Sequence, residues 1–548
     1  MTITNPILPG FFPDPSIVRV GEWFYVANSS FEWFPTIPIH RSRDLANWEF
    51  AGSLNGPGVA LDFSGIQDSG SIWAPSLSWN DGTFWLTFTV VRSFGGAQKD
   101  MDTYVTRAAD ASGPWSAPAR VTSTGFDPSI FHHEGRHWLA NMEWDNRPNG
   151  RGGFAGINVQ ELTPDGSATV GAPHSIFRSA TLIEGPNLYF RDGWYYLMTA
   201  EGGTGFNHGI LMLRSRELLG PYEADPDGSL LTSRDDDALP LQKAGHGELV
   251  TTEAGGDYLV HLASRWIESD GDRRAILGRE TCLQKVTWTP DGWLRLEQGG
   301  HHAAEQIPAP AGLIPAPSGL QMPLGLQVAP DGRPPAPAVG PSSGFPAAGE
   351  PLAWPWSTLR SPASKADWLS TTDRPGWLRL RGMRSTDSLR DQSLIAQRIR
   401  SESVSVSVVL DAAPENYTQS AGLIFYYNTS AYFYLRLSVR DTEDSLKRVV
   451  EVWERDAEKG LLVHATAVVP DSGPLLLKGT MTPNEVQFSW GTEDGGLEQL
   501  AAGLNATHLS DDYGRTLRFT GPFVGVCAQD LRDQTFCADF RQFSLTPS

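Results

Sequence analysis

The sequence predicts an all-β protein, a five-bladed β-propeller followed by a β-sandwich. Two observations lead to this fold class. In the first part of the chain a short motif and an aromatic strand return together five times, at intervals of roughly 50 to 60 residues, the length of a four-stranded propeller blade. In the last part, apolar and polar residues alternate over long runs, as they do in half-buried antiparallel strands.

The repeated motif is a short segment that leads into the first strand of each predicted blade. In register, its copies are Pro13-Asp14-Pro15-Ser16-Ile17, Trp73-Ala74-Pro75-Ser76-Leu77, Phe126-Asp127-Pro128-Ser129-Ile130, Glu184-Gly185-Pro186-Asn187-Leu188 and the degenerate Lys243-Ala244-Gly245-His246-Gly247. Each copy is followed by a turn and an aromatic strand, such as GEWFYVAN from Gly21. A single blade cannot bury both of its faces and has to stack on neighbours. Five copies therefore predict five sheets around one axis.

The chain divides into three predicted regions. Residues 1–302 contain the repeats and form the propeller, the predicted catalytic domain. Residues 303–356 are rich in proline, alanine and glycine and lack periodicity, so they are predicted to be a linker laid over both domains. Residues 357–548 contain the alternating runs, for example residues 403–408, and are predicted to form the β-sandwich.

The composition limits the partners of the protein. With 63 acidic and 43 basic side chains the formal net charge is −20, which disfavours nucleic acid and membrane surfaces and fits a neutral ligand. No run approaches the roughly eighteen apolar residues of a membrane span, and the N-terminal segment has no basic or apolar leader. Three cysteines are too few for a disulfide framework or a zinc site. We therefore expect a cytoplasmic protein.

Three carboxylates belong to the repeated motif. The residues at the start of each first strand should converge at one mouth of the central channel, and there the sequence has Asp14, Asp127 and Glu184. An isolated Asp-Pro pair is usually a turn, but recurrence in different blades favours a functional role. Carboxylates that share a small pit repel each other and lose solvent, which raises at least one pKa. This creates the acid and the base that cleavage of a glycosidic bond needs.

These motifs resemble those of glycoside hydrolase family 43. The segments FFPDPSIV, GFDPSIF and IEGPNLYF carry the resemblance, and further segments, such as residues 241–246, 277–281 and 519–525, are similar to its β-xylosidase branch. The resemblance implies an exo-acting, inverting enzyme that releases terminal D-xylose from small xylo-oligosaccharides. It also implies that no cofactor is required and that the protein forms a homo-oligomer.

The resemblance also implies roles for the carboxylates. Asp14 would be the general base that activates water, and Glu184 the general acid that protonates the leaving oxygen. Asp127 would orient Glu184 and keep its pKa high. Arg279 would bind sugar hydroxyls through its forked donors, although a salt bridge to a neighbouring carboxylate is the structural alternative.

Other residues are implied to bind the substrate. The candidates for the walls of the sugar site are Phe31, Trp73, Ala74, Phe126 and Trp144. His246 would lie on the channel axis, as part of a polar floor or as a ligand of a structural Ca²⁺, with a satisfied core histidine as the alternative. Phe523 would reach from the sandwich into the pocket and close one side of it, unless it is a core residue of the sandwich.

Two other functions stay open at this point. The first is an α-L-arabinofuranosidase acting on arabinoxylan, alone or as a dual activity, because the two pentoses present similar hydroxyls. Departures from the xylosidase pattern, such as Ser71 and Glu143, keep this alternative open. The second is a non-catalytic sugar-binding protein. Loss of one carboxylate would favour it, and none of the three is lost.

Overall fold

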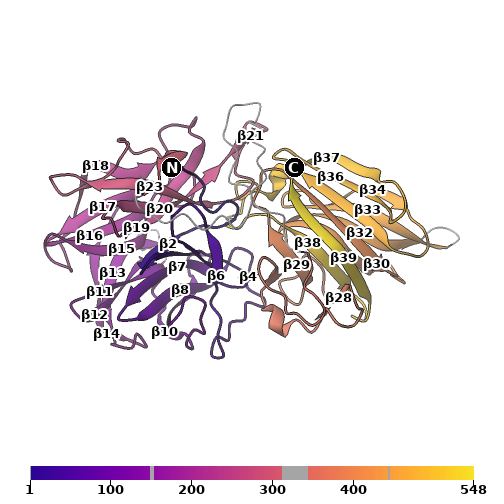
Figure 1. Cartoon of the computed structure of the whole chain (residues 1–548), viewed down its shortest axis with the longest axis horizontal. Coiled ribbons are helices and arrows are strands. Elements are labelled where there is room, and N and C mark those ends of the chain that lie inside the picture. The colour runs from indigo at the N-terminus through magenta and orange to yellow at the C-terminus, as the bar shows by residue number, and fades with distance from the viewer. Residues whose placement is uncertain (1, 148–152, 311–343, 442–444, 517) are drawn as a thin grey trace.

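The fold is described by a computed structural model that covers residues 2–147, 153–310, 344–441, 445–516 and 518–548. Two β-rich bodies lie side by side, the first running from indigo to magenta and the second from orange to yellow (Figure 1). Helix in the described ranges is limited to two 3-10 turns, η1 (Ala363–Lys365) and η2 (Ala506–Leu509). The all-β prediction is confirmed. No described helix is long and apolar enough to cross a membrane.

The first body is a propeller of five four-stranded sheets. Listed from the first strand of each, they are β2 (Ser16–Val20), β3 (Trp23–Ala27), β5 (Ile39–Ser42) and β6 (Glu49–Gly52); β7 (Ser71–Asn80), β8 (Thr83–Ser93), β9 (Asp100–Ala108) and β10 (Ala119–Thr122); β11 (Gly125–His133), β12 (Arg136–Trp144), β13 (Phe154–Leu162) and β14 (Thr169–Phe177); β15 (Ile183–Arg191), β16 (Trp194–Glu201), β17 (Gly209–Ser215) and β18 (Glu223–Thr232); and β19 (Leu241–Thr251), β20 (Asp257–Arg265), β23 (Glu280–Trp288) and β24 (Leu294–Leu296). The first strands of neighbouring blades contact one another. They therefore surround the axis, as the repeat predicts.

The N-terminal segment closes the ring onto the fifth blade. Strand β1 (Thr2–Thr4) pairs with β25 (Gln306–Pro308). The Asn5 side chain then donates to the Leu283 carbonyl at 2.8 Å and accepts from the Leu283 N–H at 2.8 Å. The β1–β25 pairing and the two Asn5 hydrogen bonds fix the first blade next to the last one. A small hairpin, β21 (Ile267–Ser269) with β22 (Asp272–Arg274), projects from the fifth blade.

The second body is a sandwich of two sheets. The eight-stranded sheet has the order β34 (Gly460–Val468), β33 (Leu446–Asp456), β32 (Ala431–Asp441), β31 (Gln419–Asn428), β38 (Phe523–Asp530), β29 (Ser393–Arg398), β26 (Ser357–Leu359) and β4 (Trp33–Phe34); the seven-stranded sheet has β27 (Leu369–Ser370), β28 (Leu378–Arg381), β39 (Cys537–Pro547), β30 (Val404–Ala412), β35 (Leu475–Met481), β36 (Glu485–Thr492) and β37 (Glu498–Asn505). Val404, Val406 and Val408 are buried in the shared core, while the serines between them are partly exposed. The apolar residues of the predicted period-two alternation thus face the core, as expected.

The two bodies share one β-sheet. Strand β4 belongs to the first blade by sequence, yet it pairs with β26 as the edge of the eight-stranded sheet. The Trp33 ring stacks on Phe523, with centroids 3.7 Å apart and an interplanar angle of 12°. Both side chains are fully buried. The sequence did not predict this exchange, because a two-residue strand carries no periodic signal.

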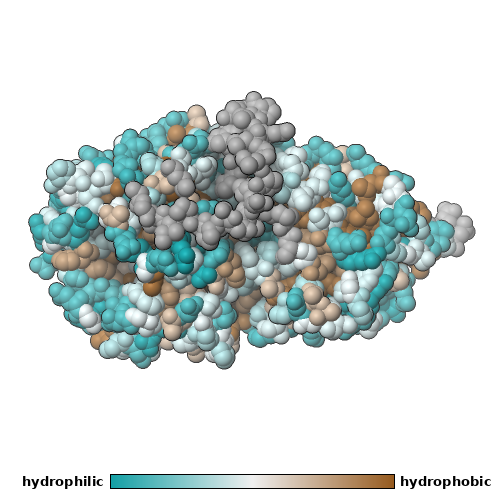
Figure 2. All heavy atoms as spheres, in the orientation of Figure 1, coloured by the Kyte–Doolittle hydropathy of each residue, from teal (hydrophilic) through white to brown (hydrophobic). Residues whose placement is uncertain are grey.

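The described ends of the predicted linker contact both bodies. The Trp354 ring stacks on Phe50 of the propeller, with centroids 4.5 Å apart, whereas Trp356 packs against Phe543 of the sandwich at 4.7 Å. Residues 311–343 of the linker lie outside the described residues. On the face shown in Figure 2, hydrophobic side chains are scattered among hydrophilic ones over both bodies.

Replacing Phe523 by alanine should destabilise the whole protein. It removes a buried ring that stacks on Trp33 at the joint of the two bodies, and such truncations cost about 3–5 kcal/mol of unfolding free energy. Denaturant unfolding followed by tryptophan fluorescence measures the loss. Phe190→Ala is the matched control, because Phe190 is 46% exposed, and should change the free energy by less than about 1 kcal/mol. Equal losses in both variants would contradict this role of Phe523.

Candidate active site

The repeated motif forms a bulge at the start of the second, third and fourth blades. In three blades the pairing of the first two strands skips two residues, between Trp73 and Ser76, Phe126 and Ser129, and Glu184 and Asn187. The second skipped residue is always proline, which cannot donate to the ladder and therefore favours a bulge there.

The backbone of the motif is left-handed at one residue near the start of the first strand in four blades. The residues are Asp14, Asp127, Gly185 and His246, with φ values of 51°, 53°, 55° and 42°. The equivalent residue of the fourth blade is thus Gly185, and Glu184 lies one position earlier. This agrees with the register of the repeat, in which Glu184 lies opposite Pro13 and Phe126 and Gly185 lies opposite the two aspartates. In the fifth blade His246, and not Ala244, takes the left-handed place, because this degenerate copy lacks the proline that marks the register.

The three carboxylates nevertheless meet in one pit of about 70 Å³ at the propeller axis. Its lining consists of Asp14, Phe31, Trp73, Ala74, Phe126, Asp127, Glu184, Thr204, His208, His246, Arg279 and Phe519. Most of the predicted site residues are in this set. Trp144 and Phe523 are not, and Thr204, His208 and Phe519 were not predicted.

Asp14 is held in an ionised state by its partners. Arg279 Nη1 donates to Oδ1 at 2.8 Å, and Ser29 Oγ donates to Oδ2 at 2.6 Å. Burial acts to raise the pKa of Asp14, but the charges of Arg279 and His246 and the Ser29 hydrogen bond outweigh it and keep the pKa below its ordinary value. A buried carboxylate that stays ionised at neutral pH can accept a proton.

Glu184 and Asp127 have the opposite tendency. Burial, and then the negative charge of Asp14, raise the pKa of Glu184 to about 7. Burial, followed by the charges of Glu184 and Asp14, raises the pKa of Asp127 well above its usual range. The sequence predicts that Asp127 keeps the pKa of Glu184 high, whereas in the structure burial and Asp14 do so. The pit thus combines one ionised carboxylate with two that hold protons near neutral pH.

Arg279 connects the two bodies at the pit. Besides Asp14, its Nη1 donates to Thr204 Oγ1 at 2.9 Å, and its Nη2 donates to the Phe519 carbonyl at 3.0 Å. The structure therefore shows the salt bridge that is the alternative role of this residue. A contact of Arg279 with sugar hydroxyls stays a prediction.

The aromatic residues form the apolar side of the pit. The rings of Trp73 and Phe126 meet edge to face at 5.1 Å, and Trp73 Nε1 donates to the Ser69 carbonyl at 2.9 Å. Trp144 lies behind Phe126, at a ring distance of 6.5 Å, and donates to the Ala97 carbonyl at 2.8 Å. It does not line the pit, and the pairing of β12 with β13 shifts register just before it.

The sandwich does reach into the pit, but through Phe519 and not through Phe523. The Phe519 N–H donates to Ser69 Oγ at 3.0 Å, and its ring lies 6.0 Å from that of Phe31. The prediction for Phe523 is wrong because β38 begins there and its side chain faces Trp33. The signal was in the sequence, since Pro522 indicates that the strand starts after it and leaves Phe519 in the loop.

Thr204 and His208 come from the loop between β16 and β17. The loop starts with Gly202 and Gly203, both left-handed with φ of 78° and 74°. Such a glycine pair at the end of a second strand predicts a tight loop, and this signal could have drawn attention to the segment.

The surroundings of His246 give little support for calcium. His246 Nδ1 lies 3.9 Å from Asp127 Oδ2, so one imidazole and one carboxylate face each other, whereas calcium takes about six to eight oxygen ligands. Within the described residues, two groups bring three potential ligands together, Asp235 with His301 and His302, and Glu454 with Asp456 and His508. Neither includes His246.

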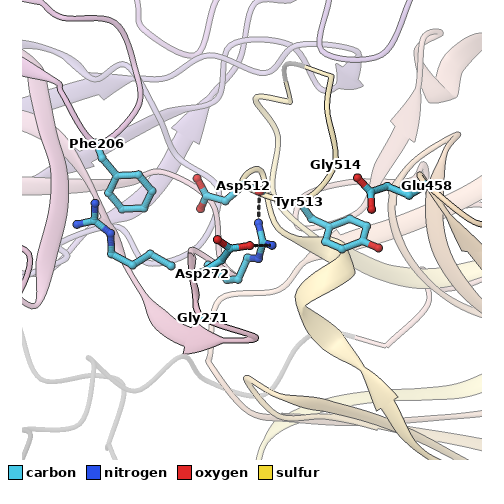
Figure 3. A pocket seen from close by; sticks show the side chains of 9 residues that line it. Phe206, Gly271, Asp272, Glu458, Asp512, Tyr513 and Gly514 are labelled. Carbon is cyan, nitrogen blue, oxygen red and sulfur yellow. Dashed lines mark hydrogen bonds and ion pairs between the residues drawn. The ribbon is translucent and has the colours of Figure 1, made fainter.

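A larger cavity of about 590 Å³ lies where β22 faces the sandwich (Figure 3). Its lining includes Phe206, Arg273, Asp512 and Tyr513. The Arg273 guanidinium covers the Phe206 ring at 3.8 Å. None of the three pit carboxylates lines this cavity.

Comparisons with known proteins agree with this geometry. A model of the glycosyl hydrolases family 43 matches residues 3–294, and one of the β-xylosidase C-terminal concanavalin A-like domain matches residues 347–546. The chain is 38% identical to xylosidase/arabinosidase 43B of Humicola insolens, over all of this chain and 98% of that protein. It is 36% identical to a xylan 1,3-β-xylosidase of a Vibrio species, over 99% and 98% of the two chains.

A solved structure extends the agreement to the whole fold. The crystal structure of xylan β-1,4-xylosidase from Bacillus halodurans C-125 superposes with a TM-score of 0.89 at 40% identity, covering 99% of this chain and all of that one. Together with the family models, this shows that the chain belongs to glycosyl hydrolase family 43 and carries its β-xylosidase-type C-terminal domain.

Proposed function

We propose that this protein is an exo-acting, inverting glycoside hydrolase that releases terminal D-xylose from xylo-oligosaccharides. The observation that carries the proposal is the pit in which one ionised carboxylate, Asp14, faces two carboxyl groups that retain protons, Glu184 and Asp127. The names of the relatives support xylose as the sugar.

The mechanism follows from the protonation states. Asp14 takes a proton from a water molecule while the oxygen of that water attacks the anomeric carbon. Glu184 gives its proton to the oxygen of the breaking glycosidic bond, so that sugar and leaving group part as neutral products. Asp14 then carries a proton and Glu184 a negative charge, and exchange with solvent restores both. The reaction uses two carboxyl groups and water, and needs no cofactor.

Inversion requires room for the water between the base and the sugar, which in such enzymes means carboxyl groups about 6.5–9.5 Å apart. Asp127, whose own carboxyl stays protonated, is proposed to orient Glu184. Phe519 supports exo action, because the sandwich loop covers one side of the pit. A closed side admits a chain end and prevents a polymer from passing through.

An α-L-arabinofuranosidase activity is the second candidate, alone or beside the first. It is supported by the double name of the Humicola insolens relative. Turnover of an aryl β-D-xyloside and an aryl α-L-arabinofuranoside by the same preparation decides between them. We expect a higher kcat/KM on the xyloside, and a higher value on the arabinofuranoside would reverse the assignment.

Three further points stay proposals. A homo-oligomer is proposed from the family membership, and light scattering after size exclusion tests it. A structural calcium ion at His246 is testable by metal analysis of the purified protein. A cytoplasmic location is supported by three free cysteines, one of them the exposed Cys537, and is tested by cell fractionation.

The roles of general acid and general base can be told apart with substrates whose leaving groups differ in acidity. For Glu184→Ala, turnover of xylobiose should fall at least about a thousandfold, whereas an aryl xyloside with an acidic phenol, which needs no proton to leave, should lose far less. Asp14→Ala should lose both activities to a similar extent, because no leaving group replaces activation of the water. Steady-state kinetics on the two substrates measures this difference. Equal losses on both substrates for Glu184→Ala would assign the acid to another residue.

The pH profile should fall on its basic side near neutrality. Glu184 must be protonated to act, and with a pKa of about 7 it loses its proton as the pH rises through that value, so kcat/KM on xylobiose should decline there. Asp14 must be ionised, and because its pKa is lowered, the acidic limb should lie below the pH range in which an ordinary aspartate titrates. In Glu184→Gln, assayed on the acidic aryl xyloside, the basic limb near pH 7 should vanish. A limb unchanged in this variant would show that another group titrates.

A further inference from the structure

His208 is a pit residue with a buried polar atom that lacks a partner. Its side chain is 1% exposed. Nδ1 lies 3.0 Å from the Lys243 carbonyl oxygen, and because a carbonyl only accepts, Nδ1 carries the ring proton. Nε2 is therefore an unprotonated acceptor. It is buried and has no hydrogen-bond partner in the described part of the chain, although the side chain lines the pit.

The position of the ring is fixed from two sides. On one side, a Cβ atom added to Gly245 would lie 2.5 Å from Cγ and Nδ1 of the ring, so only glycine fits there. On the other, Lys243 is itself held by the sandwich, through Asp511 at 3.2 Å and Asp512 at 2.5 Å. The tautomer and direction of His208 are thus set before any substrate binds.

The ring is also held neutral. Burial, and then the charge of His246, lower the pKa of His208 to about 3, so Nε2 remains an acceptor over the neutral range. The other titratable groups of the pit that face it are Asp14 and Arg279, which also act on its pKa. An acceptor that is buried without a donor costs free energy, and a ligand with an O–H group at that point recovers it.

We propose that Nε2 of His208 accepts a hydrogen bond from one hydroxyl of the terminal pentose and that His208 determines specificity for that hydroxyl. The inference deepens the proposed function and rests on it, because it requires a sugar in the pit. A sugar that lacks this hydroxyl, or presents it in another direction, leaves Nε2 unpaired and is rejected.

Two substitutions of His208 separate the roles of its two ring nitrogens. In His208→Asn the amide nitrogen can take the place of Nδ1 and keep the bond to Lys243, while the acceptor is lost. In His208→Gln the amide oxygen can take the place of Nε2, while the bond to Lys243 is lost. His174→Asn, at an exposed position of β14, is the matched control.

The test is a double-mutant cycle on kcat/KM with aryl β-D-xyloside and its 2-, 3- and 4-deoxy analogues. His208→Asn should lose about tenfold on the parent xyloside, with unchanged thermal unfolding. For one deoxy position only, the penalty seen in the wild type should shrink by about tenfold in this variant, because the partner of that hydroxyl is already gone. His208→Gln should retain the wild-type penalty at that position, and His174→Asn should behave as the wild type.

The outcomes separate the inference from the proposed function. Identical deoxy penalties in the wild type and in His208→Asn would overturn the inference, even where the wild type is an active xylosidase. A uniform loss on all four substrates would likewise overturn it, and would assign Nε2 to the attacking water or to the shape of the pit. A wild type that turns over neither xyloside nor arabinofuranoside would refute the proposed function, and this inference with it.

Discussion

The site depends on the ion pair between the Arg279 guanidinium and Asp14. The guanidinium contacts Asp14 from the first blade, Thr204 from the fourth and the Phe519 carbonyl from the sandwich. Burial acts to raise the pKa of Asp14, and the charge of Arg279 acts to lower it. Asp14 is therefore ionised in a buried place where, without Arg279, it would tend to hold a proton. The ionised Asp14 in turn adds to the effect of burial on Glu184 and Asp127. One ion pair thus keeps Asp14 ionised beside two carboxyl groups whose pKa values are raised.

The contacts between the propeller and the sandwich explain why one small pit needs both domains. A propeller alone leaves the mouth of its channel open, whereas here the loop before β38 brings Phe519 over one side. The loop is held in place by contacts that cross the boundary: β4 pairs with β26, and Ser69 accepts from the Phe519 N–H. A second ion pair, between Lys243 and the aspartates at 511 and 512, lies next to His208. The sandwich is therefore part of the active site.

Periodic features of the structure could be predicted from the sequence, and non-periodic ones could not. The five repeats predicted the blades and the three carboxylates, because each copy adds to the same pattern. The register of the repeat also carries the one-residue offset of Glu184, because the proline of each copy marks Gly185 as the equivalent of Asp14 and Asp127. Strand β4, Thr204 and His208 lie in short segments whose places are set by contacts distant in sequence. The motif at residues 519–525 pointed to Phe523, whereas the start of β38 at that residue leaves Phe519 to reach the pit.

In the proposed mechanism, Asp14 activates water for direct attack on the anomeric carbon. Proton NMR of the first sugar released from xylobiose tests it most directly, because the two anomers of xylose have separate signals and mutarotation is slower than turnover at a high enzyme concentration. We expect α-xylose, the inverted anomer, to appear first and the β-anomer to follow by mutarotation. Initial release of β-xylose would contradict it, because retention requires a carboxylate to attack the anomeric carbon first, so that water attacks only the resulting glycosyl-enzyme.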